Sequence, residues 1–420
     1  MTKVAILGQG YVGLPLAVAA ADAGHTTIGY DVDPERIRQL AAGESYVEDI
    51  GAETIRRLLA TGVYRPTSDE ADLDGFDVAV ISVPTPLREG VPDLSYIESA
   101  ARAVGRRLRP GATVVLESTT YPGTTEDLVQ PLLEEVSGLT AGQDFHLGYS
   151  PERIDPGNQT YGLKETPKVL AGISETSMKA VRDFYDQIVD TTVPVSSPQV
   201  AELSKLVENT FRHVNIALVN ELAMYANTLG IDIWEAIDAA SSKPFGFMRL
   251  TPGPGVGGHC LPIDPVFLSW RVERSVGRLF RFVELASHIN GHMPQYVVQR
   301  LVYGMNARRL AVNGSRILLL GLAYKPGTGD ARESPALRVA DLLLSMGARL
   351  HAADPHVVET SAVDERIVRV EPTPRELADS DAVVLLTDHD EFDYDMVAEH
   401  APYVLDCRRR LPRGANIEIL

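Results

Sequence analysis

Residues 3–13, KVAILGQGYVG, decide the fold of this chain. The apolar run at residues 3–7 is typical of a buried parallel strand, and it stops at Gly8. Gly8, Gly10 and Gly13 then give the spacing Gly-x-Gly-x-x-Gly where a helix is predicted to begin. In this setting the first glycine permits a tight turn, the second lets the backbone approach a pyrophosphate, and the third allows close packing of helix on strand. The stretch therefore predicts a dinucleotide-binding turn rather than an ordinary glycine turn.

The residues that follow favour NAD as the dinucleotide. A helix is predicted at residues 12–23, because Gly24 is a stop signal, and a second strand at residues 26–30. Asp31 ends that strand about twenty residues after the glycines, where a carboxylate would hold the ribose hydroxyls. A carboxylate there would repel the ribose phosphate of NADP, although the nearby Arg36 could accommodate that phosphate. The backbone N–H groups at the helix start would bind the phosphates of either cofactor.

The alternation of strand and helix continues before a helical middle begins. Apolar runs predict further strands of the first sheet at residues 77–83 and 113–116. From about residue 199 to residue 239 the sequence is helical and amphipathic, with few helix breakers. Such a helix often serves as a spine between domains or as a dimer contact, and a plain core helix fits the same pattern.

A second series of strands and helices follows. It predicts a strand at residues 316–320, a helix at 337–346, a strand at 349–353 that leads into Asp354, and a strand at 382–387. No Gly-x-Gly-x-x-Gly turn follows the first strand of this series, which predicts a ligand other than a dinucleotide. The fold class is therefore α/β, with two Rossmann-like doubly wound domains joined by a long central helix and a helical middle region.

The composition excludes several classes of protein. With 57 acidic and 39 basic side chains the formal net charge of the 420 residues is −18, which argues against nucleic acid or an anionic membrane as the main partner. Two cysteines cannot form a disulfide scaffold, and this usage fits a reducing cytoplasm. No apolar run approaches the ~18–20 residues of a membrane span, and the first residues do not resemble a secretory leader. We expect a cytoplasmic protein.

The most informative stretch outside the first turn is PGPGVGGHCLPIDP, residues 252–265. Its glycines would let a substrate approach the backbone closely, and a helix that starts near Cys260 would favour the thiolate form of that side chain. Asp264 would lie one turn along from the thiol. Cys260 is a candidate nucleophile toward an aldehyde or acyl group, and the alternative is a small buried hydrophobe. His259 has no second His/Cys cluster at ligand spacing, so no metal is predicted.

Other candidates are weaker when each is taken alone. Lys205 and Asn209 share one helix face, whose apolar neighbours would partly desolvate the ammonium, although a snorkelling surface lysine gives the same pattern. Glu152, in the turn SPER, is either a general base or a solvated loop acid. Lys325 and Arg332 flank a flexible turn and form either a phosphate clamp or a charged surface loop. Residues 408–410, three arginines, are interpreted as a solvated run.

Taken in order, these motifs resemble a known family. GQGYVG at 8–13, STTYPGTT at 118–125, SPER at 150–153, the helix from Lys205 to Asn209, GPGVGGHCLPIDP at 253–265 and AYKPGTGDARES at 323–334 are similar to those of the UDP-glucose/GDP-mannose dehydrogenase family, over essentially the whole chain. The resemblance implies a four-electron oxidation of the primary alcohol of a nucleotide sugar to the carboxylate by two NAD in turn. The reaction would pass through a thiohemiacetal and a thioester on a cysteine.

The resemblance also implies roles for individual residues. Cys260 would be the nucleophile, Lys205 would stabilise oxyanions with help from Asn209, Asp264 and Thr119 would position water, and Glu152 would be the base for thioester hydrolysis. The implied cofactor contacts are Gly8, Gly10, Tyr11, Val12, Gly13, Asp31, Arg36, Pro84, Thr85, Thr119 and Arg332. The implied substrate contacts are Glu152, Arg153, Lys205, Asn209, Arg249, Gly257 and Lys325.

The resemblance implies three domains and a homodimer. The expected ranges are an NAD-binding domain at 1–198, a central helical dimerisation domain at 199–300 and a nucleotide-sugar-binding domain at 301–420. SPERIDPGN, with Pro156 where UDP-glucose dehydrogenases carry a second carboxylate, GGHCLPIDP, and NGHMP at 290–294 are more similar to the branch that oxidises UDP-N-acetylhexosamines. UDP-N-acetylglucosamine is therefore favoured, then UDP-N-acetylmannosamine, over UDP- or dTDP-glucose. A non-catalytic NAD and nucleotide-sugar-binding regulator and a two-electron hydroxyacid dehydrogenase are the competing readings.

Overall fold

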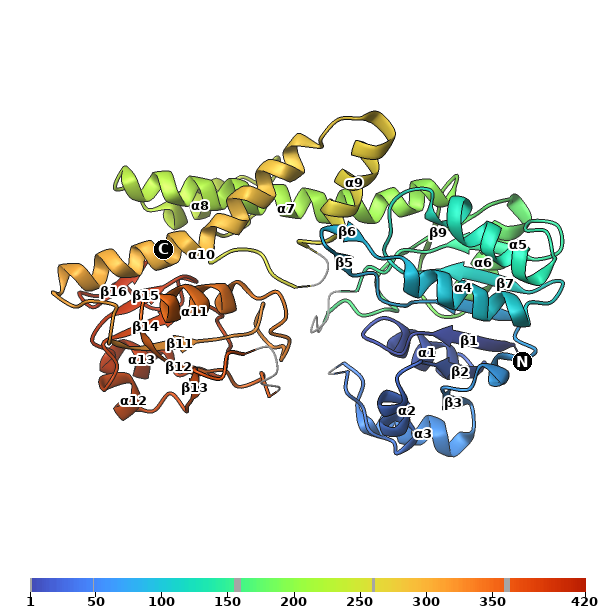
Figure 1. The fold of residues 1–420 in the computed structure, drawn as a ribbon, viewed down its shortest axis with the longest axis horizontal. Helices are drawn as coiled ribbons and strands as arrows, with labels where there is room; N and C mark the ends of the chain where they lie inside the picture. Colours follow the sequence, from blue (N-terminus) through green and yellow to red (C-terminus); the bar gives the residue numbers. More distant parts are fainter. Residues whose placement is uncertain (1, 48, 155–159, 259–260, 359–362) are drawn as a thin grey trace. The chain divides into compact units, whose positions relative to one another are not determined.

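The computed structural model describes residues 2–47, 49–154, 160–258, 261–358 and 363–420. The contacts divide the chain into two compact units, each of which is described by itself. The first unit is Met1–Glu208 with Val266–Arg278, and the second is Asn209–Pro265 with Leu279–Leu420. Each unit is built on one large sheet with helices packed against it (Figure 1). No described helix combines the length and the apolar character that a membrane crossing needs.

The first unit holds an eight-stranded sheet in the order β10-β9-β8-β7-β4-β1-β2-β3. Neighbouring strands are parallel except β8 and β9, which are antiparallel. The order β3-β2-β1-β4-β7-β8 is that of dinucleotide-binding folds, which bind ligands beyond the carboxyl ends of the strands where the order reverses, here between β1 and β4. The strands are β1 (Lys3–Leu7), β2 (Thr26–Tyr30), β3 (Tyr64–Thr67), β4 (Val78–Ile81), β7 (Thr113–Leu116), β8 (His146–Tyr149), β9 (Lys168–Gly172) and β10 (Thr192–Pro194).

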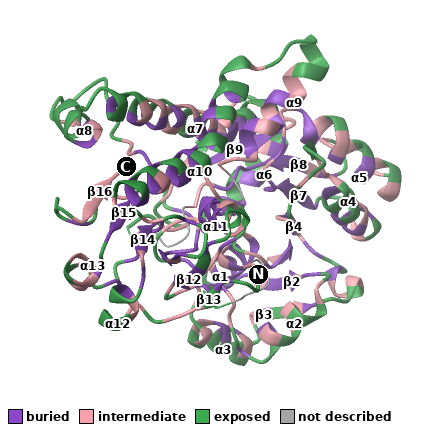
Figure 2. Ribbon diagram, turned by 60° about the vertical axis from the view of Figure 1, so that its left-hand side comes forward, coloured by how far each residue is buried: buried purple, intermediate pink, exposed green. Residues whose placement is uncertain are grey.

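Buried apolar strands explain why this sheet forms. Four of the five residues of β1 and all four of β4 and β7 are buried, which is the pattern of parallel strands covered on both faces (Figure 2). The short pair β5 (Leu87–Arg88) and β6 (Val91–Pro92) forms a separate hairpin. The helices of this unit include α1 (Gly13–Asp22), α2 (Pro34–Ala41), α3 (Ala52–Thr61), α4 (Ser95–Arg107), α5 (Gln130–Ser137), α6 (Glu175–Tyr185) and α9 (Asp264–Val276), with a 3-10 turn at Glu70–Leu73 and a π-helical turn at Thr125–Val129.

The second unit holds a six-stranded sheet in the order β13-β12-β11-β14-β15-β16, and every neighbouring pair is parallel. This repeats the strand order of the first sheet, and the order reverses between β11 and β14. The predicted second Rossmann-like series is therefore confirmed. The elements are β11 (Arg316–Leu320), β12 (Arg349–Ala353), β13 (Val368–Arg369), β14 (Ala382–Leu385), β15 (Val404–Asp406) and β16 (Ile417–Ile419), with helices α8 (Ile233–Ser241), α10 (Arg281–Ala307), α11 (Pro335–Ser345), α12 (Pro374–Ala378) and α13 (Tyr394–His400).

The predicted helical stretch at 199–239 forms two helices rather than one. Helix α7 (Pro198–Thr228) is 31 residues long, and the boundary between the two units falls within it. The chain then leaves the helix at Gly230, which adopts a left-handed φ of 71°. Asp232 starts α8, because its side chain accepts hydrogen bonds from the N–H groups of Trp234 and Glu235.

Most predicted bounds agree with the structure, and the differences are local. The strands expected at 77–83 and 382–387 are shorter, because their pairing with neighbouring strands stops at Ile81 and Leu385. The helix expected near Cys260 begins at Asp264, so this carboxylate lies at the start of α9, and residues 261–263 form a turn. Cys260 and His259 lie outside the described residues.

Candidate functional site

The glycine turn after β1 has the geometry that a bound dinucleotide needs. Gly8 has a φ of 93°, and a Cβ at this position would lie 2.6 Å from the backbone oxygen of Ser82. A Cβ on Gly13 would lie 1.8 Å from the backbone oxygen of Gly8, so the helix packs closely on the turn. A Cβ on Gly10 would meet nothing within 4 Å, which leaves this backbone open to a ligand. Each glycine therefore fits its predicted role.

Asp31 is fixed against this turn. Its side chain is buried, Oδ2 accepts a hydrogen bond from the N–H of Gln9 at 2.8 Å, and Oδ1 accepts one from the N–H of Asp33 at 2.9 Å. Nη1 of Arg36 lies 3.4 Å from Asp31 Oδ2. Gln9 is itself held by Tyr64, whose hydroxyl donates to Gln9 Oε1 at 2.9 Å. The carboxylate thus lies beside the glycine turn and is paired with Arg36, the residue named from the sequence as a possible partner of the NADP phosphate.

The remaining predicted cofactor contacts of this unit surround the carboxyl ends of β1, β4 and β7. Tyr11 is exposed and Val12 half-buried, while Pro84 is exposed at the end of β4. Thr85 Oγ1 donates to the backbone oxygen of Thr119 at 2.9 Å, which joins the loops after β4 and β7. The open backbone at Gly10, the ribose carboxylate and these loops fit a dinucleotide at the reversal of strand order.

The loop after β7 is tied to α7 by Glu202, which is fully buried. Its carboxylate accepts hydrogen bonds from the N–H of Gly123 at 2.5 Å, the N–H of Thr125 at 2.9 Å and Thr125 Oγ1 at 2.7 Å. Burial raises the pKa of Glu202 to about 7, although these hydrogen bonds act against the rise. No sequence pattern indicates this contact, because Gly123 and Thr125 are 79 and 77 positions from Glu202 along the chain.

Lys205 and Glu152 are both buried in the first unit. Lys205, one turn along α7 from Glu202, is 7% exposed, so it is not a snorkelling surface lysine. Glu152 is 8% exposed, so it is not a solvated loop acid. The guanidinium of Arg153 binds two other groups: Nη2 lies 2.7 Å from Glu208 Oε1, and Nη1 donates to the backbone oxygen of Pro167 at 2.7 Å.

In the second unit Asn209 and Asp264 are brought together. Both are buried, and Asn209 Nδ2 donates to Asp264 Oδ2. The hydrogen bond joins the first residue of α9 to α7. Both residues belong to the set that the family resemblance predicts to act with Cys260.

The glycine-rich stretch lies against the loop that carries Lys325. A Cβ on Gly257 would lie 2.7 Å from the backbone oxygen of Glu333 and 3.0 Å from Cβ of Tyr324. A Cβ on Gly258 would lie 2.9 Å from the ring of Tyr324, and Gly258 has a φ of 87°. Only glycine fits these contacts. The sequence predicts that these glycines let a substrate approach the backbone. In the structure they let residues 324–335 approach it.

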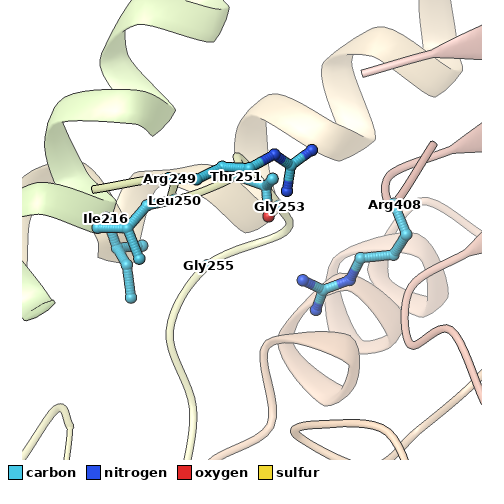
Figure 3. Close-up of a pocket in the computed structure, with 7 residues that line it drawn as sticks. All are labelled: Ile216, Arg249, Leu250, Thr251, Gly253, Gly255 and Arg408. Atoms are coloured by element: carbon cyan, nitrogen blue, oxygen red, sulfur yellow. The ribbon is translucent and has the colours of Figure 1, made fainter. Parts of the chain in front are cut away.

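The same stretch lines a pocket of about 240 Å³ in the second unit (Figure 3). Arg249 belongs to its wall, and its Nη2 lies 2.9 Å from Asp238 Oδ1. The other guanidinium of the pocket belongs to Arg408, whose Nη1 would lie 2.7 Å from a Cβ on Gly253. Two guanidinium groups and glycine backbone suit a phosphorylated ligand. The lining residues are Ile216, Arg249, Leu250, Thr251, Gly253, Gly255 and Arg408.

The prediction of a solvated arginine run at 408–410 is wrong for its first member. Arg408 Nε donates to the backbone oxygen of Leu386 at 2.7 Å, and its side chain is 21% exposed. Arg409 and Arg410 pair with Asp238 and Asp390. The sequence does not distinguish these three adjacent arginines. The turn after β15 directs Arg408 into the pocket wall.

The other predicted cations of the second unit differ in their settings. Lys325 is half-buried, with Nζ 5.8 Å from the ring centre of Tyr324. Arg332 is exposed and bound to Asp330, with Nη2 2.9 Å from Oδ2 and Nε 3.0 Å from Oδ1. Because Asp330 binds its guanidinium, the exposed side chain of Arg332 is held in one orientation.

The second sheet also carries a carboxylate after its second strand, as the first does. Asp354 Oδ2 accepts hydrogen bonds from the N–H groups of Leu322 at 2.7 Å and Ala323 at 3.0 Å, and lies 3.0 Å from His389 Nε2. The N–H of Gly327 donates to His389 Nδ1 at 3.3 Å, so Nε2 must carry the proton. Burial acts to raise the pKa of Asp354, but the hydrogen bonds from His389 and the two N–H groups hold it below its ordinary value.

Comparison with known proteins identifies three matching family regions. The chain matches the sequence models of the UDP-glucose/GDP-mannose dehydrogenase family for its NAD binding domain at residues 2–189, its central domain at residues 199–292 and its UDP binding domain at residues 318–413. The glycine turn lies in the first of these regions, and the loop of Lys325 lies in the third.

Individual relatives cover nearly the whole chain. It is 37% identical to a UDP-N-acetyl-D-mannosamine dehydrogenase of Pyrococcus horikoshii, over 93% of this chain and 90% of that protein. It is 36% identical to a UDP-N-acetyl-D-glucosamine 6-dehydrogenase of Pseudomonas aeruginosa, over 93% and 91%. A solved structure of UDP-D-ManNAc dehydrogenase from Pyrococcus horikoshii matches with a TM-score of 0.90 at 33% identity, over 99% of this chain and 98% of that one.

Proposed function

This chain belongs to the UDP-glucose/GDP-mannose dehydrogenase family as an NAD-dependent nucleotide-sugar dehydrogenase, and we propose that it oxidises the primary alcohol of UDP-N-acetylglucosamine to the carboxylate. The observation that carries the substrate class is the pocket lined by Arg249 and Arg408 in the second unit, whose two cations suit a diphosphate. The motifs SPERIDPGN and NGHMP favour an N-acetylhexosamine over glucose.

A second candidate is UDP-N-acetylmannosamine. It is favoured by the relative from Pyrococcus horikoshii, whose identity to this chain is 37%, against 36% for the relative named for the glucosamine substrate. The two sugars differ in configuration at the carbon that bears the acetamido group.

The proposed chemistry assigns roles to the predicted residues. NAD, when bound, accepts hydride from the substrate in each oxidation. Cys260 attacks the aldehyde carbon, and Lys205 with Asn209 stabilises the oxyanion. After the second oxidation, water attacks the thioester carbon, Glu152 takes a proton from that water, the C–S bond breaks, and the sulfur leaves as thiolate. Asp264 and Thr119 position the water.

The remaining predicted contacts are proposed to bind the two ligands. Gly8, Gly10, Tyr11, Val12, Gly13, Asp31, Arg36, Pro84, Thr85 and Arg332 hold the dinucleotide, and Arg153, Arg249, Gly257 and Lys325 hold the nucleotide sugar. The proposed domain ranges are 1–198 for NAD, 199–300 for the helical middle and 301–420 for the nucleotide sugar.

We infer a homodimer through α7. In the second unit this helix exposes an apolar stripe at three- and four-residue spacing, on which Phe211, Leu218, Leu222 and Tyr225 are 46%, 52%, 44% and 60% exposed. A stripe of this kind on a long helix is an association surface. Light scattering should give twice the mass of the chain, and Leu218→Asp/Leu222→Asp should give the single mass; a wild-type monomer would overturn the inference.

The function is tested with a panel of UDP- and dTDP-sugars and NAD, with products identified by mass. The proposal expects uronate from UDP-N-acetylglucosamine and two NADH for each uronate. Uronate only from UDP-N-acetylmannosamine would select the second candidate. One NADH for each substrate would favour a two-electron dehydrogenase, and NAD binding without NADH formation on any sugar would favour a regulatory protein. Cys260→Ala should abolish uronate formation, and near-normal uronate in that variant would overturn the covalent route.

A further inference from the structure

Three buried polar side chains of the first unit surround Glu152, and the proposed chemistry does not use them. Glu117 directly follows β7, Lys168 begins β9, and Tyr185 ends α6. Their exposed fractions are 1%, 3% and 0%. Charged groups are almost never buried to this extent unless they are paired. Three elements of the fold, β7, β9 and α6, therefore bring an ionisable group close to the candidate base.

Lys168 is the centre of this cluster. Its Nζ lies 2.8 Å from Glu117 Oε1 and 3.7 Å from Glu152 Oε2. The hydroxyl of Tyr185 donates to the same Oε1 of Glu117 at 2.5 Å, and the Tyr185 ring centre lies 5.4 Å from Nζ. The backbone N–H of Ile154 donates to the other oxygen of Glu152. The ammonium thus bridges two carboxylates and is held more tightly by the one that is not proposed to react.

The charges in the cluster do not balance, because one ammonium faces two carboxylates. Burial raises the pKa of Glu117, while the charge of Lys168 acts against that rise. Burial acts to lower the pKa of Lys168, but the charges of Glu117 and Glu152 outweigh it and raise that pKa overall. Burial likewise raises the pKa of Tyr185, so its hydroxyl keeps its proton and remains a donor. The cation is therefore permanent, and the two carboxylates compete for it.

From this arrangement we propose that Lys168 is a positioning residue for Glu152, whose carboxylate it holds in one orientation, and that Glu117 limits how much of the ammonium charge Glu152 receives. The proposal rests on the proposed role of Glu152 as the base of thioester hydrolysis. Lys168, Glu117 and Tyr185 each interact electrostatically with Glu152. The guanidinium of Arg153 is held by Glu208. Only the ionised carboxylate can take a proton from water, and removal of a nearby ammonium should lower the fraction of that carboxylate that is ionised in acid.

The test follows the hydrolytic step across the acid limb of its pH profile. Single-turnover reactions with NAD and UDP-N-acetylglucosamine are quenched, uronate release is measured by mass, and NADH is measured in the same samples. Lys168→Met should move the midpoint of the acid limb of uronate release upward by about one to two pH units. Lys168→Arg should return it toward the wild-type position. Glu117→Gln removes the competing charge and should move it downward.

Matched variants separate this role from a structural one. Lys179→Met, on the exposed face of α6 where Lys179 pairs with Asp183, is the control for loss of a lysine and should leave the midpoint unchanged. Lys168→Met alone leaves the buried carboxylate of Glu117 without its ammonium partner, and the double variant Glu117→Gln/Lys168→Met removes that carboxylate as well. It keeps the test open if Lys168→Met does not fold, and its midpoint should also lie above that of the wild type. Lower thermal stability with an unmoved midpoint in the folded variants would overturn the proposal.

The outcomes for the base and for its positioning are distinguishable. If Glu152→Gln releases uronate at the wild-type rate at every pH, the role of Glu152 in the proposed function is wrong. If Glu152→Gln stops release while Lys168→Met keeps the wild-type midpoint, only the positioning role is wrong. If the midpoint of uronate release moves upward in Lys168→Met and downward in Glu117→Gln, with unchanged NADH formation, the results would support both the role of Glu152 as base and the positioning role of Lys168.

Discussion

The side-chain oxygen of Asn220 accepts a hydrogen bond from the backbone N–H of Gly253, and the two atoms are 3.0 Å apart. Asn220 Nδ2 donates in turn to Asn290 Oδ1 at 2.9 Å, and Asn290 Nδ2 donates to the backbone oxygen of His213 at 3.1 Å. All three side chains are buried, and burial lowers the pKa of His213 to about 4, which keeps its ring neutral. Side chains of α7 and α10 thus fasten the start of the glycine-rich stretch.

The first prediction concerns this fastening. Asn220→Leu leaves the N–H of Gly253 and the amide of Asn290 without their partner, at a cost of about 1–3 kcal/mol. We expect the KM for the nucleotide sugar to rise at least about fivefold, since 1 kcal/mol is about that factor, while the Kd for NAD is unchanged. Steady-state kinetics and calorimetric titration of NAD measure the two. Asn215→Leu on the same helix is the control, and equal effects of the two changes would contradict the prediction.

The second prediction concerns the choice of cofactor. Asp31→Ser removes the charge that would repel a ribose phosphate and releases Arg36, which lies 3.4 Å from that carboxylate. The ratio of kcat/KM for NADP to that for NAD should rise by at least about tenfold, as expected when an arginine gains a phosphate partner worth about 1.5–3 kcal/mol. Asp31→Ser/Arg36→Ala should lose the gain with NADP. A double variant that keeps it would show that Arg36 is not the phosphate contact.

The third prediction concerns stability and the buried Glu202. Its pKa is raised to about 7 in the folded protein from 4.5, so the folded state binds its proton more tightly than the unfolded state. Its contribution to stability is therefore fully present below pH 4.5 and is lost as pH rises toward 7. The loss is about 3 kcal/mol at most, at about 1.4 kcal/mol for each unit. Glu202→Gln cannot titrate and should lack this loss.

Melting temperatures at acid and neutral pH measure this difference. As pH rises from 4.5 to about 7, the melting temperature of the wild type should fall relative to that of Glu202→Gln. Glu98→Gln, at an exposed position of α4, should follow the wild type throughout. A gap that stays constant with pH would mean that the pKa of Glu202 is the same in the folded and unfolded states.

The fourth prediction concerns the pocket of the second unit. Arg408→Met removes a guanidinium from its wall, and we expect the Kd for UDP to rise at least about tenfold, within the 1.5–3 kcal/mol typical of hydrogen bonds to charged groups. Arg410→Met is a matched control, because that side chain pairs with Asp390 and does not line the pocket. Calorimetric titration of UDP decides it. Equal affinities in the two variants would place the diphosphate elsewhere.

The sequence was informative wherever one short stretch contains the whole signal. The glycine turn and Asp31 could be predicted because their spacing is local and each glycine has a separate steric reason. The second sheet could be predicted because its strands repeat the same apolar runs. The break after α7 was missed, because Gly230 is one glycine within a helical pattern, and its left-handed conformation became visible only in the structure.

The long-range contacts could not be predicted in this way. Lys168 is 51 positions from Glu117 and meets it because β9 pairs antiparallel beside β8, a pairing that no local pattern encodes. Arg408 and Arg249 come to one pocket from distant parts of the chain. The roles of individual site residues, including Cys260, which lies outside the described residues, stay predictions drawn from the family resemblance.

The carboxylate of Asp354 has a consequence for ligand discrimination. Its two oxygens already receive five donors, from the N–H groups of Leu322, Ala323, His356 and Val357 and from His389. An ionised carboxylate has about four lone-pair sites, so no acceptor is left for a ribose hydroxyl. The two sheets share one strand order. Asp31 follows the second strand of the first sheet and is predicted to bind a ribose, whereas the hydrogen bonds of Asp354, at the matching place in the second sheet, leave that carboxylate unable to do so.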